Sequence, residues 1–160
     1  EVKRELQARG FEPLTLGPGS SYDYDAPLVG IRRILTHCCG LISVAFRRMH
    51  VTSATRHLGA DISGRAEEVS TNSWLTSPYC QIEPAMAFQL GLPILILREE
   101  GVLAEGVLEK GVTGLYLPEF NLDASATFVN SDECRRLLDQ WGGYVRTVHK
   151  RRGDPPLLYE

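Results

Sequence analysis

Residues 73–97 constrain the fold most, because a polar loop, a short helix and an apolar strand are predicted there in direct succession. The run Ile94-Leu95-Ile96-Leu97 has no polar side chain, which is typical of a parallel strand that is covered on both faces. Pro84 suits the first position of a helix, and Gly91 suits its end. Parallel strands need crossover connections, so a helix followed by such a strand predicts an α/β fold.

Glu83 directly precedes Pro84, and the sequence therefore predicts a carboxylate at the N-terminus of this helix. Free N–H groups and the helix dipole keep a carboxylate ionised at that position, without a raised pKa. Glu83 is accordingly a candidate reactive group. The alternative is an ordinary acidic residue in a first helical turn, which the local sequence alone favours.

The length of 160 residues fits a single domain over 1–160, and 43% hydrophobic and 23% charged residues are typical of a globular protein. A net charge of -3 gives no bulk attraction to nucleic acid or to anionic lipid, and the apolar runs are too short to span a bilayer. The four cysteines and four histidines lack the spacing of metal ligands. We therefore expect a cytoplasmic protein with no metal, no nucleic-acid partner and no membrane partner.

Other stretches alternate between helical and strand patterns. We expect helices at 1–10, from Pro27, at 100–110 and at 131–150, and strands at 11–16, 39–46 and 112–117. Residues 47–78 show no pattern, and we interpret them as a long loop insert that selects the substrate or forms a lid. The alternation predicts a parallel sheet that binds its ligand beyond the carboxyl ends of the strands. Because such folds normally start on a strand and this chain starts on a helix, we expect a first strand upstream of Glu1.

The run Ser77-Pro-Tyr-Cys80-Gln-Ile-Glu83, followed by Ala85, Ala87 and the strand 93–97, resembles the pattern of Toll/interleukin-1 receptor (TIR) domains. It is also similar to the nucleoside 2-deoxyribosyltransferase family, whose strand entry resembles Gly91-Leu92-Pro93-Ile94. A looser likeness extends over 6–97. Tyr79 stands where the TIR pattern has tryptophan, and the aspartate-serine-glycine-threonine element of the transferases is absent.

This resemblance implies a flavodoxin-like three-layer α/β/α fold with a central parallel sheet. In both families the matching glutamate acts on an N-glycosidic bond. The resemblance therefore implies a nucleotide- or nucleoside-processing N-glycosidase or transferase, in which Glu83 is catalytic. NAD enters as a possible substrate, and no cofactor is expected.

Cleavage of an N-glycosidic bond passes through an oxocarbenium-like state, which a fixed carboxylate can stabilise or attack. Asp23 and Asp25 are candidates for protonating the leaving base; the alternative is a solvated turn in which Asp25 caps a helix. Further side chains are candidates for contacting the substrate, by stacking on a base, by closing the pocket, or by binding phosphate or ribose: Tyr22, Tyr24, Arg47, Trp74, Ser77 and Tyr79. The alternatives for them are ordinary packing and, for Arg47, a solvated strand exit.

Two rival functions use the same fold without catalysis. One is a nucleotide-sensing or self-associating TIR-like module, and the other is an adaptor that makes protein contacts only. A homo-oligomer is expected in either the catalytic or the self-associating case.

Overall fold

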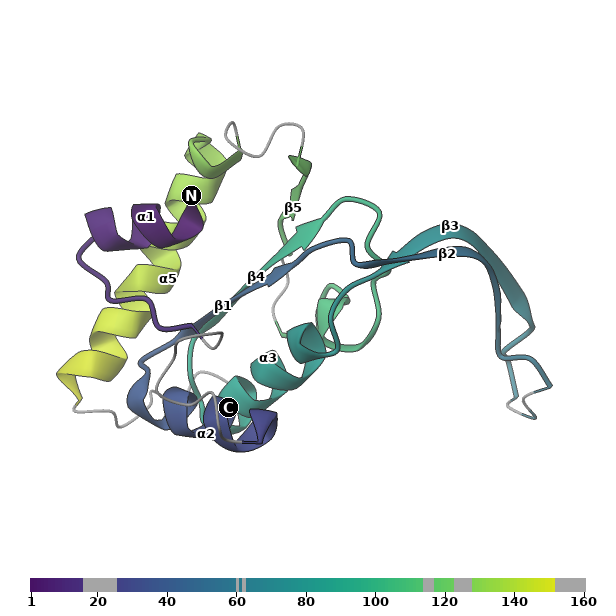
Figure 1. Cartoon of the computed structure of the whole chain (residues 1–160), viewed down its shortest axis with the longest axis horizontal. Coiled ribbons are helices and arrows are strands. Elements are labelled where there is room, and N and C mark those ends of the chain that lie inside the picture. The colour runs from purple at the N-terminus through teal and green to yellow at the C-terminus, as the bar shows by residue number, and fades with distance from the viewer. Residues whose placement is uncertain (16–25, 60, 62, 114–116, 123–127, 152–160) are drawn as a thin grey trace.

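The computed structural model describes residues 1–15, 26–59, 61, 63–113, 117–122 and 128–151 (Figure 1). These residues form a mixed α/β structure with a three-stranded parallel sheet and a separate two-stranded antiparallel sheet. The elements in chain order are α1 (Val2–Ala8), α2 (Pro27–His37), β1 (Leu41–Ala45), β2 (Met49–Arg56), β3 (Glu68–Leu75), α3 (Tyr79–Gln89), β4 (Ile94–Glu99), the 3-10 helix η1 (Gly106–Leu108), β5 (Glu119–Phe120) and α5 (Asp132–Lys150).

The parallel sheet has the order β1-β4-β5. Strands β1 and β4 pair from Leu41 with Ile94 to Ala45 with Arg98, and β5 joins the end of β4. Strand β4 is buried along almost its whole length, as its unbroken apolar run predicts. The two strands expected at 39–46 and 94–97 and their parallel pairing are therefore confirmed.

Helices pack against β4 from different sides. Helices α1 and α5 form one cluster with Leu95 and Leu97, whereas α2 and α3 form a second cluster beside Ile94. The 19-residue helix α5 begins as expected at Ser131, whose Oγ accepts a hydrogen bond from the Cys134 N–H at 3.1 Å. Trp141 secures α5 to the sheet, since its indole N–H donates to the Pro93 carbonyl at 3.1 Å.

Three expected elements differ from the structure. Residues 11–15 are not a strand, and Leu16 lies outside the described residues. Instead of a helix at 100–110, only η1 forms, because Gly101, Gly106 and Gly111 all adopt positive φ and interrupt a helix. The third strand, expected at 112–117, is β5 at 119–120, and residues 114–116 lie outside the described part of the chain.

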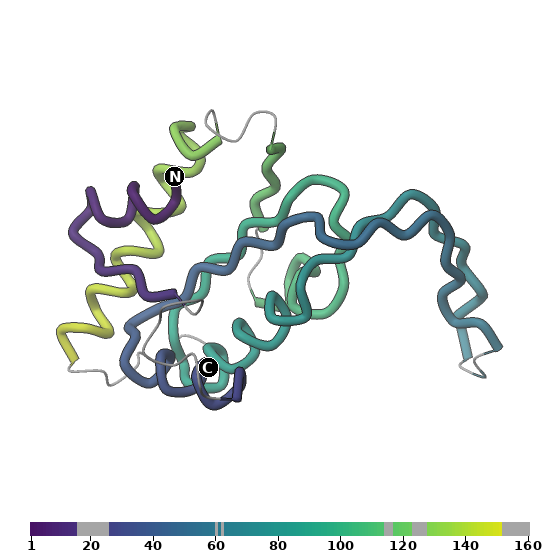
Figure 2. Tube along the Cα trace, in the orientation of Figure 1, coloured from purple at the N-terminus to yellow at the C-terminus, as the bar shows by residue number. Residues whose placement is uncertain are grey.

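Residues 47–78 do not form an irregular loop, so this expectation was wrong. Strands β2 and β3, of eight residues each, pair antiparallel from Met49 with Leu75 to Arg56 with Glu68. The resulting hairpin projects from the rest of the molecule as an arm (Figures 1 and 2). Both of its faces are largely exposed, so the sequence lacks the apolar alternation that marks a half-buried strand.

No helix in the described ranges is long and apolar enough to cross a membrane.

Candidate functional site

Helix α3 begins at the carboxyl edge of the parallel sheet. The Cys80 thiol lies 3.7 Å from the carbonyl of Val44, near the end of β1. Gln81 ties the same turn to the segment around η1: its side-chain amide donates to the Glu105 carbonyl at 2.8 Å, and its Oε1 accepts from the Val107 N–H at 3.0 Å. The first turn of α3 is thereby fixed where a parallel α/β sheet binds its ligands.

Glu83 lies inside α3 and not at its N-terminus, which corrects the sequence prediction. The helix starts at Tyr79, four residues before Glu83, and Pro84 is an interior proline. Ser77 and Pro78 provide the actual start: Ser77 Oγ accepts a hydrogen bond from the Tyr79 N–H at 3.3 Å, and Pro78 occupies the cap position. Pro84 was therefore mistaken for the first helical residue.

The position of Glu83 on α3 places it between the exposed start of the helix and the residues of α3 that pack against α2. Residues 79, 83 and 87 share one helix face because they are four apart. Tyr79 is 38% exposed at the outer end of this face, whereas Ala87 is fully buried against Ile31 and Leu35 of α2. Glu83 lies between them, half-buried and one helical turn, about 6 Å along the axis, from Tyr79.

Burial raises the pKa of Glu83 above the ordinary value of a glutamate, and desolvation is the cause. The ionised state that a helix N-terminus was expected to favour is thus disfavoured here. Within the described part of the chain, the carboxylate has no hydrogen-bond or ion-pair partner. A half-buried carboxylate without a partner costs folding free energy, and such groups concentrate at functional sites.

Arg47 and Trp74 attach the hairpin to the end of β4. The Arg47 backbone N–H donates to Glu99 Oε2 at 2.7 Å, and its Nε donates to the Glu100 carbonyl at 2.6 Å. The Arg47 guanidinium also lies 5.9 Å from the centre of the Trp74 ring, which packs 4.6 Å from His50. Through these contacts, Arg47 holds the base of the hairpin against the end of β4.

The sequence-predicted contact residues are partly brought together. Ser77 Oγ accepts from Arg48 Nη1 at 3.1 Å, so the end of the hairpin meets the start of α3. Arg47, Trp74, Ser77 and Tyr79 therefore gather at the carboxyl edge, and Glu83 lies one turn further along α3. Four further candidates lie outside the described residues: Tyr22, Asp23, Tyr24 and Asp25.

Sequence reasoning missed Arg98 and Glu99, which are only 7% and 3% exposed at the end of β4. Arg98 donates to the Leu108 carbonyl at 3.1 Å and pairs with Glu119, whereas Glu99 lies 3.6 Å from Arg47 Nε. The available signal was the run of three charges at 98–100, directly after an apolar strand. Charges at the carboxyl end of a buried parallel strand are either paired or functional.

Among the residues that the structure describes, no three histidine, cysteine or acidic side chains are grouped so that they could hold a metal ion. Comparison of the chain with family models, with curated proteins and with solved structures found no match.

Proposed function

We propose that this chain forms a flavodoxin-like three-layer domain that binds a nucleotide or nucleoside and cleaves or transfers at its N-glycosidic bond. The observation that carries the proposal is the half-buried Glu83 carboxylate on α3, which has no hydrogen-bond or ion-pair partner among the described residues. Under this proposal the protein acts on a small molecule in the cytoplasm and has no nucleic-acid or membrane partner. NAD is a candidate substrate, and the chemistry requires no cofactor.

The proposed reaction requires few catalytic groups besides one carboxylate. The bond between the sugar C1′ and the base nitrogen breaks, and its electron pair leaves with the base. Glu83 stabilises the positive charge on C1′, or attacks it, before the oxygen of water or the nitrogen of a second base forms the new bond. Nicotinamide leaves NAD as a neutral base and needs no proton, whereas the attacking water releases one.

The surroundings of Glu83 support this role. Helix α3 begins at the carboxyl edge, where a helix N-terminus favours anionic groups such as phosphate. Tyr79, at the exposed end of the Glu83 face, can stack on a base. A site of this composition suits a ligand with a phosphate, a sugar and an aromatic base.

The test is to incubate the purified protein with NAD, NADP, nucleosides and deoxynucleosides and to measure free base by chromatography. Glu83→Gln keeps the shape of the side chain but removes its charge, and Glu109→Gln serves as the matched control because Glu109 is exposed. We expect base release by the wild type and by the control, and loss in Glu83→Gln. Base release that persists in Glu83→Gln would contradict the proposal.

One observation favours a second candidate, a self-associating module without catalysis. The β2–β3 arm exposes Met49, Leu58 and Val69 by 61%, 73% and 66%, and a lone two-stranded hairpin is only marginally stable. A homo-oligomer that covers the arm would bury these apolar side chains and would stabilise the hairpin. Sedimentation of the wild type and of Val69→Lys tests this: an oligomer that the substitution dissociates, with no base release by either protein, would favour assembly over catalysis.

A further inference from the structure

The β2–β3 arm has an inner half, next to the parallel sheet, and an outer half, residues 53–71, which are held very differently. The inner half is bonded to the segment after β4, since the Trp74 N–H donates to the Gly101 carbonyl at 3.2 Å. The described side chains of the outer half are mostly exposed. Among the described residues, only the ion pair of Arg56 with Glu105, at 2.6 Å, connects the outer half by a polar contact to the molecule beyond the arm.

The two halves meet at a kink. The strands pair on either side of Thr52 and Asn72, but these two residues do not pair with each other. Asn72 has a φ of 52°, in the left-handed region that asparagine adopts more readily than most residues. The Oγ atoms of Ser70 and Ser73 lie 2.6 Å apart, although residues three apart in a straight strand are separated by about 10 Å and point to opposite faces. The chain therefore bends sharply at Asn72, and the arm is visibly curved (Figures 1 and 2).

The ion pair fastens the bent arm to the segment around η1. Glu105 lies just before η1, and its carbonyl accepts a hydrogen bond from the Gln81 side-chain amide at 2.8 Å. The segment that receives the arm therefore also holds the first turn of α3. An ion pair at the surface contributes little to stability and is weakened by salt. Such a contact is suited to forming and breaking rather than to clamping the arm permanently.

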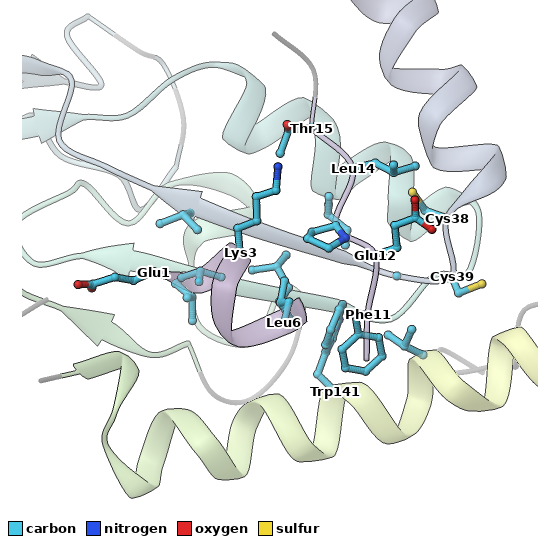
Figure 3. Close-up of a pocket in the computed structure, with 18 of the residues that line it drawn as sticks. Glu1, Lys3, Leu6, Phe11, Glu12, Leu14, Thr15, Cys38, Cys39 and Trp141 are labelled. Atoms are coloured by element: carbon cyan, nitrogen blue, oxygen red, sulfur yellow. The ribbon is translucent and has the colours of Figure 1, made fainter. Parts of the chain in front are cut away.

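A groove beside β1 lies apart from the arm. Leu6, Phe11 and Trp141 line it (Figure 3), and none of the residues that line it belongs to the β2–β3 arm. The arm is thus fastened beside the first turn of α3 and not over this groove.

We propose that the arm is a strap with two positions, in which residues 53–71 move as one unit about a hinge at Asn72. In the bent position, Arg56 and Glu105 fasten the strap. In the released position, Asn72 adopts an extended φ, pairs with Thr52 and lets the strands continue straight. Each position has its own stabilising contacts: the bent one has the ion pair and the hydroxyl–hydroxyl bond across the kink, and the straight one has a complete ladder without a positive φ. Hinges of this kind absorb a large φ/ψ change in a few residues.

The distance between the outer arm and α5 reports the position of the strap. Nitroxide amino acids replace Ala54 and Gln140, which are both exposed, and double electron–electron resonance measures the distance in protein diluted with unlabelled chains. We expect two discrete distances, of which the bent one dominates in the wild type. Glu105→Gln should raise the population of the second distance about two- to fivefold, the effect of one exposed ion pair on an equilibrium. High salt should raise it in the wild type but not in Glu105→Gln.

Asn72→Val tests the hinge with the same labels. A β-branched side chain disfavours positive φ, so the second distance should become the dominant one. Thr71→Val is the matched control for the hinge, because Thr71 is exposed beside it and has no positive φ. Glu109→Gln is the matched control for the latch, because Glu109 is exposed on the other side of η1. Both controls should keep the distances and populations of the wild type.

The proposal is overturned if Asn72→Val and Glu105→Gln leave the two populations unchanged, or if only one of them shifts the populations. A single distance in all proteins would show a rigid arm, and a broad continuous distribution would show simple flexibility; either result overturns the proposal. An equal response of the wild type and Glu105→Gln to salt overturns the role of the ion pair. If the labels disturb the fold, residual dipolar couplings of the amides in residues 53–56 measure the orientation of the outer half, and the same criteria apply.

Discussion

At the scale of single residues, Glu83 combines a cost to folding with its proposed role in the reaction. Its carboxylate is half-buried on α3 and lacks a partner among the described residues, so the protein carries a charge that packing alone does not favour. Stability lost at one position in this way is common at sites that have been shaped for chemistry. The raised pKa makes this cost measurable, because it changes with pH.

We therefore predict that Glu83→Gln stabilises the protein at pH 7 and that this advantage shrinks as the pH falls. A group whose pKa is raised by folding favours the folded state below its unfolded pKa, about 4.3 for glutamate, and loses that contribution as the pH rises through the folded value. Urea denaturation at several pH values checks this, with Glu109→Gln as control. A gain from Glu83→Gln that is equal at pH 4 and pH 7 would show that burial does not perturb this carboxyl.

At the scale of elements, the β2–β3 arm depends on a small set of contacts at its base. Arg47 and Trp74 connect it to the end of β4, through Glu99 on one side and through the Trp74 N–H to the Gly101 carbonyl, at 3.2 Å, on the other. Further out, Arg56 forms an ion pair with Glu105 at 2.6 Å. The last contact joins the half-buried Arg56 to the exposed Glu105 and contributes little, so the buried Glu99 is the main fixed point.

Glu99→Gln is expected to loosen the arm while the rest of the fold persists. The substitution weakens the hydrogen bond from the Arg47 N–H and removes the opposite charge, at a cost of about 1 kcal/mol because Arg47 remains partly solvated. Limited proteolysis reports this directly: cleavage within residues 49–75 should accelerate relative to the wild type and to Glu109→Gln. An unchanged rate of cleavage would contradict the prediction, because contacts other than those of Glu99 would then hold the arm.

At the scale of the whole molecule, α5 is held against the sheet by a close approach at Gly40. A Cβ at this position would lie 2.6 Å from Val145 Cγ2 and 3.1 Å from the Trp141 ring, so only glycine fits without movement. Trp141 meanwhile bonds to the Pro93 carbonyl beside the start of β4. The joint between α5 and the sheet is therefore tight at the end opposite the candidate site.

Gly40→Ala should consequently lower the free energy of unfolding by about 1–3 kcal/mol, as overpacking of a core typically does. Gly143→Ala is the matched control, because a Cβ there meets nothing within 4 Å and alanine favours a helix. Chemical denaturation should show loss in the first variant and no loss, or a small gain, in the second. Equal free energies of unfolding for the two variants would contradict the close approach of α5 to the sheet at Gly40.

The sequence predicted those parts of the molecule in which burial leaves a periodic pattern. The apolar runs of β1 and β4 and the stripe of α5 have such patterns, and all three elements formed where expected. The hairpin was missed because both its faces are exposed and no pattern arises. The sequence identified Glu83 as the candidate residue but did not predict the environment of its carboxylate. That environment, which sets the pKa, depends on a helix that begins four residues earlier and on packing against α2.

The central claim is that Glu83 breaks an N-glycosidic bond, and the most direct measurement is the rate of base release from NAD and the nucleoside panel by wild type and Glu83→Gln. The account predicts release by the wild type and a fall of roughly 100-fold or more in the variant, the size expected when a charge that acts at the reacting carbon is lost. Equal rates in the two proteins, or no release by the wild type from any compound tested, would contradict it.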